Sequence, residues 1–524
     1  MALEGDLVEF LVINRFDRIP QGPLPLGVLT RDDWDDHGWR TTFHLAVVDE
    51  GGRHREIGMV KIGAFGMNRN TQYRVPMANY FEALTAGHFS VGQDVSYYER
   101  IKELGYQIRV QLLRALRDIA FDEEVFTAAR EEEVTKDSLL RNLRIATINE
   151  QFRRIAREGG DRLLAYRVVY EAPAQPGGGG VRLSFEAKPG SLPPSNVHAL
   201  TGRNGVGKSL LLQRLVRAVV DPDGDPAEVG TVREDNRVRV PFVNLVTVSF
   251  SPFDDLPPAP VESLVSMTHV GLRIPPRPGS GDVSTHTPLK SDSRLKRDFA
   301  ESVEACLNGE QRARWLASLR TLSYSGSGLL EGDWLDTFQG IKSPRRRRTV
   351  VNQLFASLSS GHKALLLTIT RLVELVDERT LVIIDEPETH IHPPQIAAFV
   401  RALSDLLTDR NGLAIVATHS PVVLQEVPAD CVWKLHRAGE RLVANRPTTE
   451  TFGESVGVIT HEIFGLEVKE AGFHREVSRL VGLGLSYPDI LLRFQGRLGG
   501  EARIIARSLI ELRESGEIPG GGVH

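Results

Sequence analysis

The stretch Gly202-Arg203-Asn204-Gly205-Val206-Gly207-Lys208-Ser209 decides how the rest of the chain is interpreted. An apolar run at 197–200 precedes it and apolar residues at helical spacing follow it, a pattern that predicts a strand, a glycine-rich turn and a helix. In that context, backbone N–H groups and the helix N-terminus can surround phosphate oxygens. Lys208 would neutralise terminal phosphate oxygens, and the Ser209 hydroxyl would ligate Mg²⁺. The alternative is a glycine-rich loop without a ligand, which the motifs below argue against.

Two further apolar runs end in polar residues. Residues 381–384 lead to Asp385 and Glu386, and residues 413–417 lead to Thr418-His419-Ser420. Because ligands bind at the carboxyl edge of a parallel sheet, we expect these residues to lie near the glycine-rich loop. Asp385 would hold Mg²⁺ and Glu386 would polarise an attacking water, while His419 would sense the γ-phosphate. The alternatives are a strand merely capped by acids and a core histidine.

A third motif, Leu358-Ser359-Ser360-Gly361-His362, opens another predicted helix. In this order, the motifs resemble those of ATP-binding-cassette (ABC) ATPases, with His362 in place of the family's signature glutamine. The resemblance covers about 180–435 and implies an α/β P-loop ABC ATPase fold with an antiparallel β subdomain and helical insertions. It also implies ATP and Mg²⁺ as ligands, ATP hydrolysis that depends on Lys208, Glu386 and His419, and two ATP molecules held between head-to-tail subunits. Ser360 and Gly361 would then act on the γ-phosphate of the partner's ATP.

The nucleotide-binding set that follows from the loop and the signature is Gly202, Arg203, Asn204, Gly205, Val206, Gly207, Lys208, Ser209, Leu210, Ser359, Ser360, Gly361 and His362. The implied metal ligands are Ser209 and Asp385. One departure concerns the family's glutamine loop, because no glutamine follows the predicted strand at 242–250. Either Ser251 or Asp254 takes its place, or coupling to the partner differs.

The branch of the family is indicated by residues 388–393, Glu-Thr-His-Ile-His-Pro. This stretch is similar to the soluble branch with SMC, RecF-like and OLD-type ATPases, and to ATPases of bacterial antiphage systems. The segments at 451–454 and 464–467, with the helical end, are similar to Septu- and retron-associated ATPases. His390 and His392 could suggest a metal pair, but no third ligand is evident. The region after 435 lacks the acidic residues of an OLD-type nuclease domain, so any cleavage would come from a partner.

Length and composition limit the classes of protein to which this chain can belong. The chain has 524 residues and a net charge of −5, so it should hold roughly two to four domains and has no global basic field. It has two cysteines, which fits a reducing compartment. Neither a signal peptide nor an apolar run long enough to span a membrane is evident. We therefore expect a cytoplasmic protein without a membrane contact.

The pattern of apolar, polar and turn-forming residues divides the chain into six expected segments. These are 1–75, the N-terminal β-rich part of the ATPase lobe; 76–162, a helical insertion; 163–250, the phosphate-loop lobe; 251–350, a helical and irregular insertion lobe; 351–436, the signature, Walker B and switch-histidine segment; and 437–524, a mainly helical C-terminal region. Strands are expected at 5–13, 41–49 and 54–64, in an antiparallel sheet that feeds the parallel one. Residues 257–295, rich in Pro, Ser and Gly, are expected to form an exposed excursion.

The sequence leaves three functions open. The leading hypothesis is an ABC-type ATPase that acts as a homodimer or higher even oligomer and controls a partner nuclease in antiphage defence. The alternative is an ATP-gated DNA-binding clamp in DNA repair or recombination, and the third is a transporter motor. Four adjacent arginines, Arg345, Arg346, Arg347 and Arg348, could contact DNA phosphates, although solvated charge is the commoner explanation.

Overall fold

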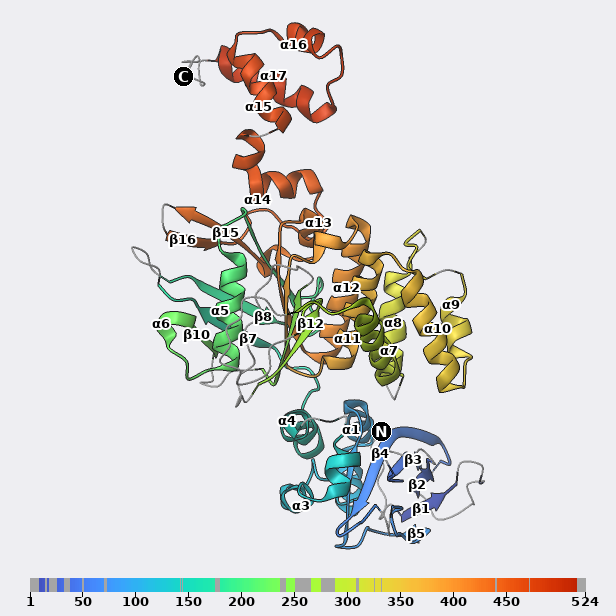
Figure 1. The fold of residues 1–524 in the computed structure, drawn as a ribbon. Helices are drawn as coiled ribbons and strands as arrows, with labels where there is room; N and C mark the ends of the chain where they lie inside the picture. Colours follow the sequence, from blue (N-terminus) through green and yellow to red (C-terminus); the bar gives the residue numbers. More distant parts are fainter. Residues whose placement is uncertain are drawn as a thin grey trace.

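The chain is arranged as an N-terminal region, a central ATPase lobe and a C-terminal helical projection (Figure 1). A computed structural model describes these residues: 9–14, 17, 26–32, 38–49, 51–69, 73–141, 143, 145–174, 180–235, 242–249, 265–274, 288–307, 311–324, 326–330, 332–438, 441–470 and 472–515.

The N-terminal region is built on a six-stranded sheet of order β5-β1-β2-β3-β4-β6. β1 and β2 pair in parallel, and the other neighbours are antiparallel. The strands are β1 (Glu9–Ile13), β2 (Leu26–Arg31), β3 (Thr42–Val48), β4 (His54–Ala64), β5 (Tyr80–Phe81) and β6 (His88–Gly92). Helices α1 (Val95–Glu103), α2 (Tyr106–Ala115), α3 (Glu123–Ala129) and α4 (Ile145–Thr147) follow, and several short π-helical turns lie between 135 and 158.

This region has a hydrophobic core of its own, which joins strand residues such as Phe10 and Leu45 to helix residues such as Tyr98 and Leu112. In the described part of the chain its strands pair only with one another, although residues 1–75 were expected to be the β-rich part of the ATPase lobe. The expected strands at 41–49 and 54–64 are present, but β2 and β6 were not expected. β2 follows a Pro/Gly-rich stretch, and β6 lies within a segment whose overall pattern is helical.

The central lobe is an α/β unit around a seven-stranded sheet of order β12-β11-β13-β14-β9-β15-β16. All pairs are parallel except β15 with β16. The strands are β9 (Val197–Gly202), β11 (Asn244–Ser249), β12 (Ser266–Gly271), β13 (Thr380–Asp385), β14 (Leu413–Thr418), β15 (Val432–Ala438) and β16 (Arg441–Asn445). β12 lies inside the 257–295 stretch that was expected to be an excursion, and it forms the edge of the sheet.

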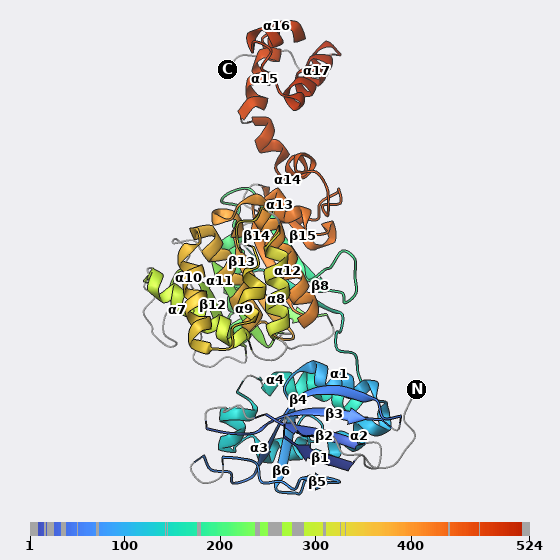
Figure 2. The same cartoon turned by 90° about the vertical axis from the view of Figure 1, so that its right-hand side faces the viewer.

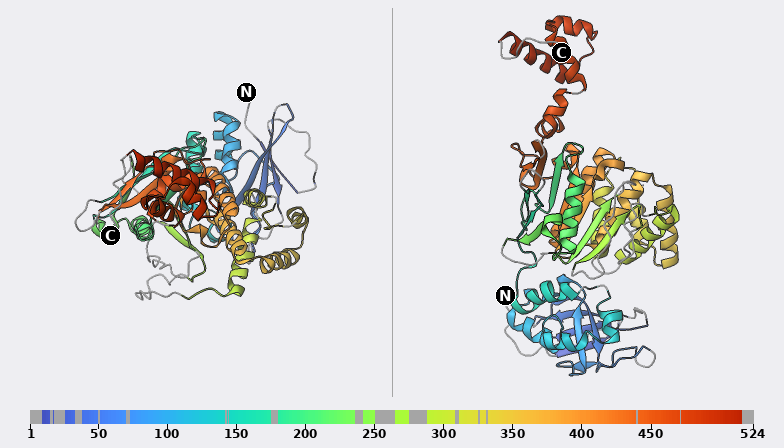
Figure 3. Two further views of the ribbon diagram at one scale, coloured as in Figure 1. Left: turned by 90° about the horizontal axis from the view of Figure 1, so that it is seen from above. Right: turned by 60° about the vertical axis from the view of Figure 1, so that its left-hand side comes forward.

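Both faces of this sheet are covered, so its strands are apolar runs rather than alternating patterns. On β13, Val382 and Ile384 face a core with helices α11 (Ser360–Leu375) and α12 (Pro393–Arg410). Leu381 and Ile383 face a second core with α5 (Lys208–Val220). A three-stranded antiparallel sheet of order β10-β7-β8 adds to that second core: β7 (Tyr166–Glu171), β8 (Arg182–Ala187) and β10 (Thr231–Glu234). The two faces are visible in Figures 2 and 3.

The remaining helices flank the lobe. On the α11 side lie α7 (Asp292–Cys306), α8 (Gln311–Leu322), α9 (Trp334–Gln339) and α10 (Pro344–Ser357). After the sheet come α13 (Pro421–Gln425) and α14 (Val456–Glu470), and the chain then forms α15 (Gly472–Gly482), α16 (Tyr487–Arg493) and α17 (Gly500–Glu514). The last three helices have a separate core and project away from the ATPase lobe (Figure 1). The whole is the expected P-loop ABC ATPase fold, with its antiparallel β subdomain and added helices.

Charged side chains join the N-terminal region to the lobe at the amino edge of the seven-stranded sheet. Arg314 donates to Asp94 (3.1 Å) and to Asp409 (2.8 Å), and Arg162 also pairs with Asp409. Nearby, Arg154 pairs with Glu378 (3.0 Å), which lies two residues before β13. The N-terminal region is thus held at the edge opposite to the polar strand ends Asp385 and Thr418.

Candidate functional site

The glycine-rich loop links β9 to α5, as the sequence predicts. Gly202, Gly205 and Gly207 have φ angles of 150°, 73° and 108°, which side-chain-bearing residues rarely adopt. A Cβ on Gly202 would lie 2.2 Å from the carbonyl oxygen of Leu435, so the loop leaves the sheet in close contact with β15. At Gly205 and Gly207 an added Cβ would meet nothing within 4 Å, so the loop surface there is open to a ligand.

Lys208 lies at the start of α5, and its side chain crosses the loop. The residue is 5% exposed, and its Nζ donates to the carbonyl oxygen of Gly202 (3.2 Å). The same Nζ is 2.5 Å from Nε2 of His419, which follows β14. This contact joins the glycine-rich loop to the polar end of a neighbouring strand, as expected for the carboxyl edge of a parallel sheet.

Glu386 follows the last residue of β13 and reaches the same place. Asp385 pairs in register with Ala417, and the Glu386 amide donates to the Ala417 carbonyl oxygen (2.9 Å). Glu386 itself adopts a left-handed conformation, with φ 43°. Its Oε1 lies 3.3 Å from Nε2 of His419, and its side chain is 46% exposed. Lys208, Glu386 and His419 therefore converge, with the carboxylate accessible from solvent.

Glu388 is a site residue to which the sequence analysis gave no role. Its Oε1 accepts hydrogen bonds from the Thr418 hydroxyl (2.8 Å) and from the His419 amide (2.6 Å). Thr418 in turn accepts from the Ser420 amide (2.9 Å). Glu388 therefore fixes the backbone that presents His419 to Lys208 and Glu386. Spacing in the sequence does not identify this role, because it depends on contacts with Thr418 and His419 that only the folded chain brings near.

The residues present fit a nucleotide phosphate chain with Mg²⁺. The loop offers open glycine positions and a buried lysine, and α5 packs against β13. The predicted metal ligands lie at the start of that helix and the end of that strand: Ser209 and Asp385. Within the described part of the chain, no group of three or more His, Cys, Asp and Glu side chains could hold a metal ion alone. Such a pair of oxygen ligands suits Mg²⁺, which is usually held by one or two protein groups and substrate phosphates.

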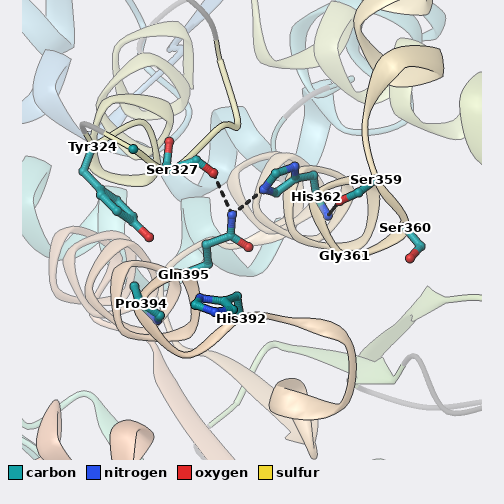
Figure 4. Close-up of a pocket in the computed structure, with 10 residues that line it drawn as sticks. Tyr324, Ser327, Ser359, Ser360, Gly361, His362, His392, Pro394 and Gln395 are labelled. Atoms are coloured by element: carbon teal, nitrogen blue, oxygen red, sulfur yellow. Dashed lines mark hydrogen bonds between the residues drawn. The ribbon is translucent and has the colours of Figure 1, made fainter.

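The signature residues lie at the N-terminus of α11, beside the N-terminus of α12. Ser359 caps α11 by accepting from the His362 amide (3.3 Å). The imidazole Nε2 of His362 contacts Nε2 of Gln395, and that amide nitrogen also donates to the Ser327 carbonyl oxygen (2.9 Å). Figure 4 shows these residues around a pocket of 510 Å³. This pocket, called the signature pocket below, is lined by Tyr324, Gly326, Ser327, Ser359, Ser360, Gly361, His362, His392, Pro394 and Gln395.

None of these lining residues belongs to the glycine-rich loop or to the Lys208–His419–Glu386 group. Within the described residues, one copy of the chain therefore presents the loop and the signature as two separate surfaces. The structure does not address the glutamine loop: β11 ends at Ser249, and the candidates Ser251 and Asp254 lie outside the described residues. The side chain of His390 is not described either.

The four arginines begin helix α10. Ser343 caps the helix, and Arg345, Arg346 and Arg348 are exposed to solvent. Arg347 pairs with Glu304 (3.0 Å). No acidic residue stands in this first turn, where positive side chains face the positive end of the helix dipole.

The fold and these motifs define the class of protein: a P-loop ATPase of the ABC type. A family model described as "AAA domain, putative AbiEii toxin, Type IV TA system" matches residues 334–425, which extend from the start of α9 to the end of α13 and include the signature and β13. Protein ea59 of Escherichia phage lambda is 34% identical over 539 residues, covering 98% of this chain and 100% of that protein. The chain belongs to the family of Protein ea59.

Solved structures with detectable similarity include two bacterial proteins. One is cbiO1 from Clostridium perfringens, part of the ABC transporter complex cbiONQ, at 17% identity, 63% of this chain, 100% of that chain and a TM-score of 0.30. The other is UvrA2 from Deinococcus radiodurans, at 18% identity, 54% of this chain, 37% of that chain and a TM-score of 0.28. Because these TM-scores are low, the fold assignment rests on the strand order and the loop geometry. Among the helices that the structure describes, none has the length and apolar character needed to cross a bilayer.

Proposed function

We propose that this protein is an ATP hydrolase that binds ATP with Mg²⁺ and acts as a dimer or higher even oligomer. The observation that carries this proposal is the convergence of Lys208, His419 and Glu386 at the carboxyl edge of the sheet. The three groups come from distant parts of the chain, yet they meet beside the glycine-rich loop. Convergence of a lysine, a histidine and an exposed carboxylate suits transfer of a phosphoryl group to water.

Each residue has a part in that reaction. Backbone amides of residues 202–210 would surround the β- and γ-phosphates, and Lys208 would neutralise their oxygens. Mg²⁺, held through Ser209 and Asp385, would supply further charge neutralisation. Glu386 would orient and deprotonate the attacking water, and His419, held by Glu388, would contact the γ-phosphate. The exposed position of Glu386 leaves room for that water.

The separation of the two surfaces supports a composite arrangement. The Ser359–His362 segment opens onto its own pocket, away from the loop of the same copy. The N-terminus of α11 and the Ser360 hydroxyl would stabilise the γ-phosphate of an ATP bound by a second copy. This reading is in line with the resemblance to ABC ATPases, in which a head-to-tail pair holds two ATP molecules.

Steady-state hydrolysis tests the proposal. Glu386→Gln should lower kcat by a factor on the order of 10² to 10⁴ while ATP still binds, because a general base contributes about this much. Lys208→Ala should weaken ATP binding itself. Glu501→Gln, an exposed change on α17, is the matched control and should leave both quantities unchanged. Hydrolysis by Glu386→Gln at the wild-type rate would remove the assigned base and the proposal with it.

The biological use of hydrolysis is the finer part of the proposal. ATP-driven dimerisation would control a partner nuclease in antiphage defence, a hypothesis supported by the resemblance of residues 388–393 to ATPases of such systems. Co-expression with products of neighbouring nuclease genes, followed by affinity purification of Glu386→Gln with Mg-ATP, would test it. Retention of a nuclease only with ATP supports the hypothesis, and its absence from the purified complex in all nucleotide conditions contradicts it.

The alternative function, an ATP-gated DNA clamp, is favoured by one observation. Arg345 and Arg346 stand exposed in the first turn of α10, where each costs up to about 1 kcal/mol against the helix dipole, and exposed Arg348 follows that turn. Binding of DNA phosphates would offset that cost. The triple change of these arginines to Gln should reduce duplex binding and flatten its salt dependence by up to about three counterions. The same change at exposed Arg475, Arg497 and Arg503 is the control.

A further inference from the structure

Gln395 lies where three segments of the lobe meet. It is in the first turn of α12, three residues after His392, and it is 8% exposed. Its amide nitrogen contacts the carbonyl oxygen of Ser327, in the loop between α8 and α9, and Nε2 of His362 in the signature. Figure 4 shows the amide between these two partners, at the wall of the pocket. One buried side chain thus links the α8–α9 loop, α11 and α12.

These contacts define the protonation of the His362 ring. A carbonyl oxygen can only accept, so the Gln395 amide donates one of its two hydrogens to Ser327. The other hydrogen is donated to Nε2 of His362, which must therefore be the unprotonated nitrogen of a neutral ring. The single N–H of that ring is then at Nδ1.

The ring is also confined by its surroundings. A Cβ added at Gly328, which has a φ of 64°, would lie 3.7 Å from Cε1 of His362, so the α8–α9 loop packs against the ring edge. The His362 amide is already used by the Ser359 cap (3.3 Å). Its imidazole therefore has a defined place between the α8–α9 loop and Gln395, in the pocket wall.

We propose that Gln395 is a positioning residue that sets the tautomer and orientation of His362, so that Nδ1–H is the donor this ring offers to a ligand in the signature pocket. In the proposed composite site that ligand is the terminal phosphate of ATP bound by a second copy. The expected effect of Gln395 on ATP turnover rests on the proposed function, whereas the expected Nδ1–H tautomer of His362 does not. Gln395 acts only through His362 and needs no contact with substrate.

The direct test is the protonation of His362 in solution. We would record ¹H–¹⁵N correlations of the imidazole rings in histidine-labelled full-length protein, and assign His362 by its loss in His362→Gln. We expect the Nδ1–H tautomer in the wild type. Gln395→Met keeps the side-chain length but removes the donor, and should shift the ring to the Nε2–H form that free histidine side chains favour. A wild-type Nε2–H ring, or a ring unchanged in Gln395→Met, would overturn the proposal.

Gln395→Ala is a second variant in case methionine disturbs the packing of α12, and Gln339→Met is the matched control. Gln339 also donates to a carbonyl oxygen, that of Leu335 (3.3 Å), but it does not line the pocket. Its substitution should leave the His362 signals in place. Shifted His362 signals in Gln339→Met would mean that the tautomer responds to general changes in the lobe and not to Gln395.

Kinetics separate this proposal from the proposed function. Gln395→Met and His362→Ala should each lower kcat by about tenfold, leave the affinity of the glycine-rich loop for ATP unchanged, and show no further loss when combined. Additive losses would contradict action through His362. If the wild type hydrolyses no ATP, the proposed function fails while the ring spectra still decide the role of Gln395.

Discussion

The two large sheets of this protein differ in where their polar residues lie. In the seven-stranded sheet, β13 and β14 are buried along their length. Asp385, Glu386 and His419 lie where these strands end, at one edge of the sheet. In the six-stranded sheet, β3 and β4 pair as neighbours in opposite directions, so their carboxyl ends do not meet. A buried carboxyl group of the same region, Asp118, lies between α2 and α3 and accepts a hydrogen bond from the Tyr98 hydroxyl inside the core.

This difference shows how strand direction controls where chemistry can gather. Parallel strands bring all their carboxyl ends to one edge, so short motifs far apart in sequence become neighbours. In the N-terminal sheet most neighbouring strands run in opposite directions, with β1 and β2 as the parallel exception. The N-terminal region contacts the opposite side of the ATPase lobe through Asp94 and Arg154. The predictions below test this division of roles.

The largest effect is expected at Gly202. Alanine there would place a Cβ 2.2 Å from the backbone oxygen of Leu435, at a φ of 150°, so the exit from β9 cannot keep its position. We expect Gly202→Ala to abolish ATP binding and to destabilise the lobe by on the order of 3 kcal/mol. Gly52→Ala in the turn between β3 and β4, also at a positive φ but with open space, should cost only about 1 kcal/mol and leave ATP binding intact. Calorimetric titration and urea unfolding measure both.

The N-terminal region should lose stability as pH rises. Burial raises the pKa of Asp118 to about 7, although hydrogen bonds from Tyr98 and from the amides of Ala120 and Phe121 lower it. Between about pH 4 and 7 the folded state therefore holds a proton that the unfolded state releases, so the free energy of unfolding falls by up to about 4 kcal/mol as pH rises. Urea unfolding of this region at pH 4.5 and pH 8 measures the loss.

Asp118→Asn should flatten this pH dependence, and Asp161→Asn, at an exposed site, should preserve it. Stability that rises between pH 4.5 and pH 8 in the wild type and in Asp161→Asn but not in Asp118→Asn would show that the carboxyl is ionised in the folded state.

The contact between the two regions should depend on Arg314. Burial opposes its charge, but Asp94 and Asp409 on either side raise its pKa above the usual value. Arg314→Ala would leave these two carboxylates without that partner and should weaken the contact by on the order of 3 kcal/mol. Faster amide hydrogen exchange at residues 95–103 and 407–412 would report it. Arg320→Ala, exposed on the same helix, is the control, and equal exchange in both variants would contradict the assigned contact.

The smallest effect is expected for an exposed ion pair in the ATPase lobe. Arg217 and Glu228 are 3.3 Å apart, and their side chains are 52% and 65% exposed. Arg217→Ala should change the free energy of unfolding by no more than about 0.5 kcal/mol and leave hydrolysis unchanged. A loss above about 1 kcal/mol in urea unfolding would contradict the expectation that this exposed ion pair contributes little to stability.

The central sheet was predictable from sequence because β9, β13 and β14 are apolar runs ending in recognisable polar residues. β2 and β6 were missed for the opposite reason: they are short and their flanking segments carry loop or helix patterns. Glu388 and Gln395 could not be assigned from spacing, since their roles depend on Thr418 and His362, partners that only the folded chain brings near. Motifs with regular backbone geometry could therefore be predicted from the sequence, whereas side-chain contacts between distant residues could not.

The most direct test of the account is the mass of Glu386→Gln in solution, measured by light scattering with and without Mg-ATP. Loss of the base should trap ATP between two copies, so the account expects the mass to double on addition of Mg-ATP and to stay at the lower value with Lys208→Ala in the same background. A mass that does not change when calorimetry shows ATP bound would contradict the composite site, and with it the proposed use of the signature pocket.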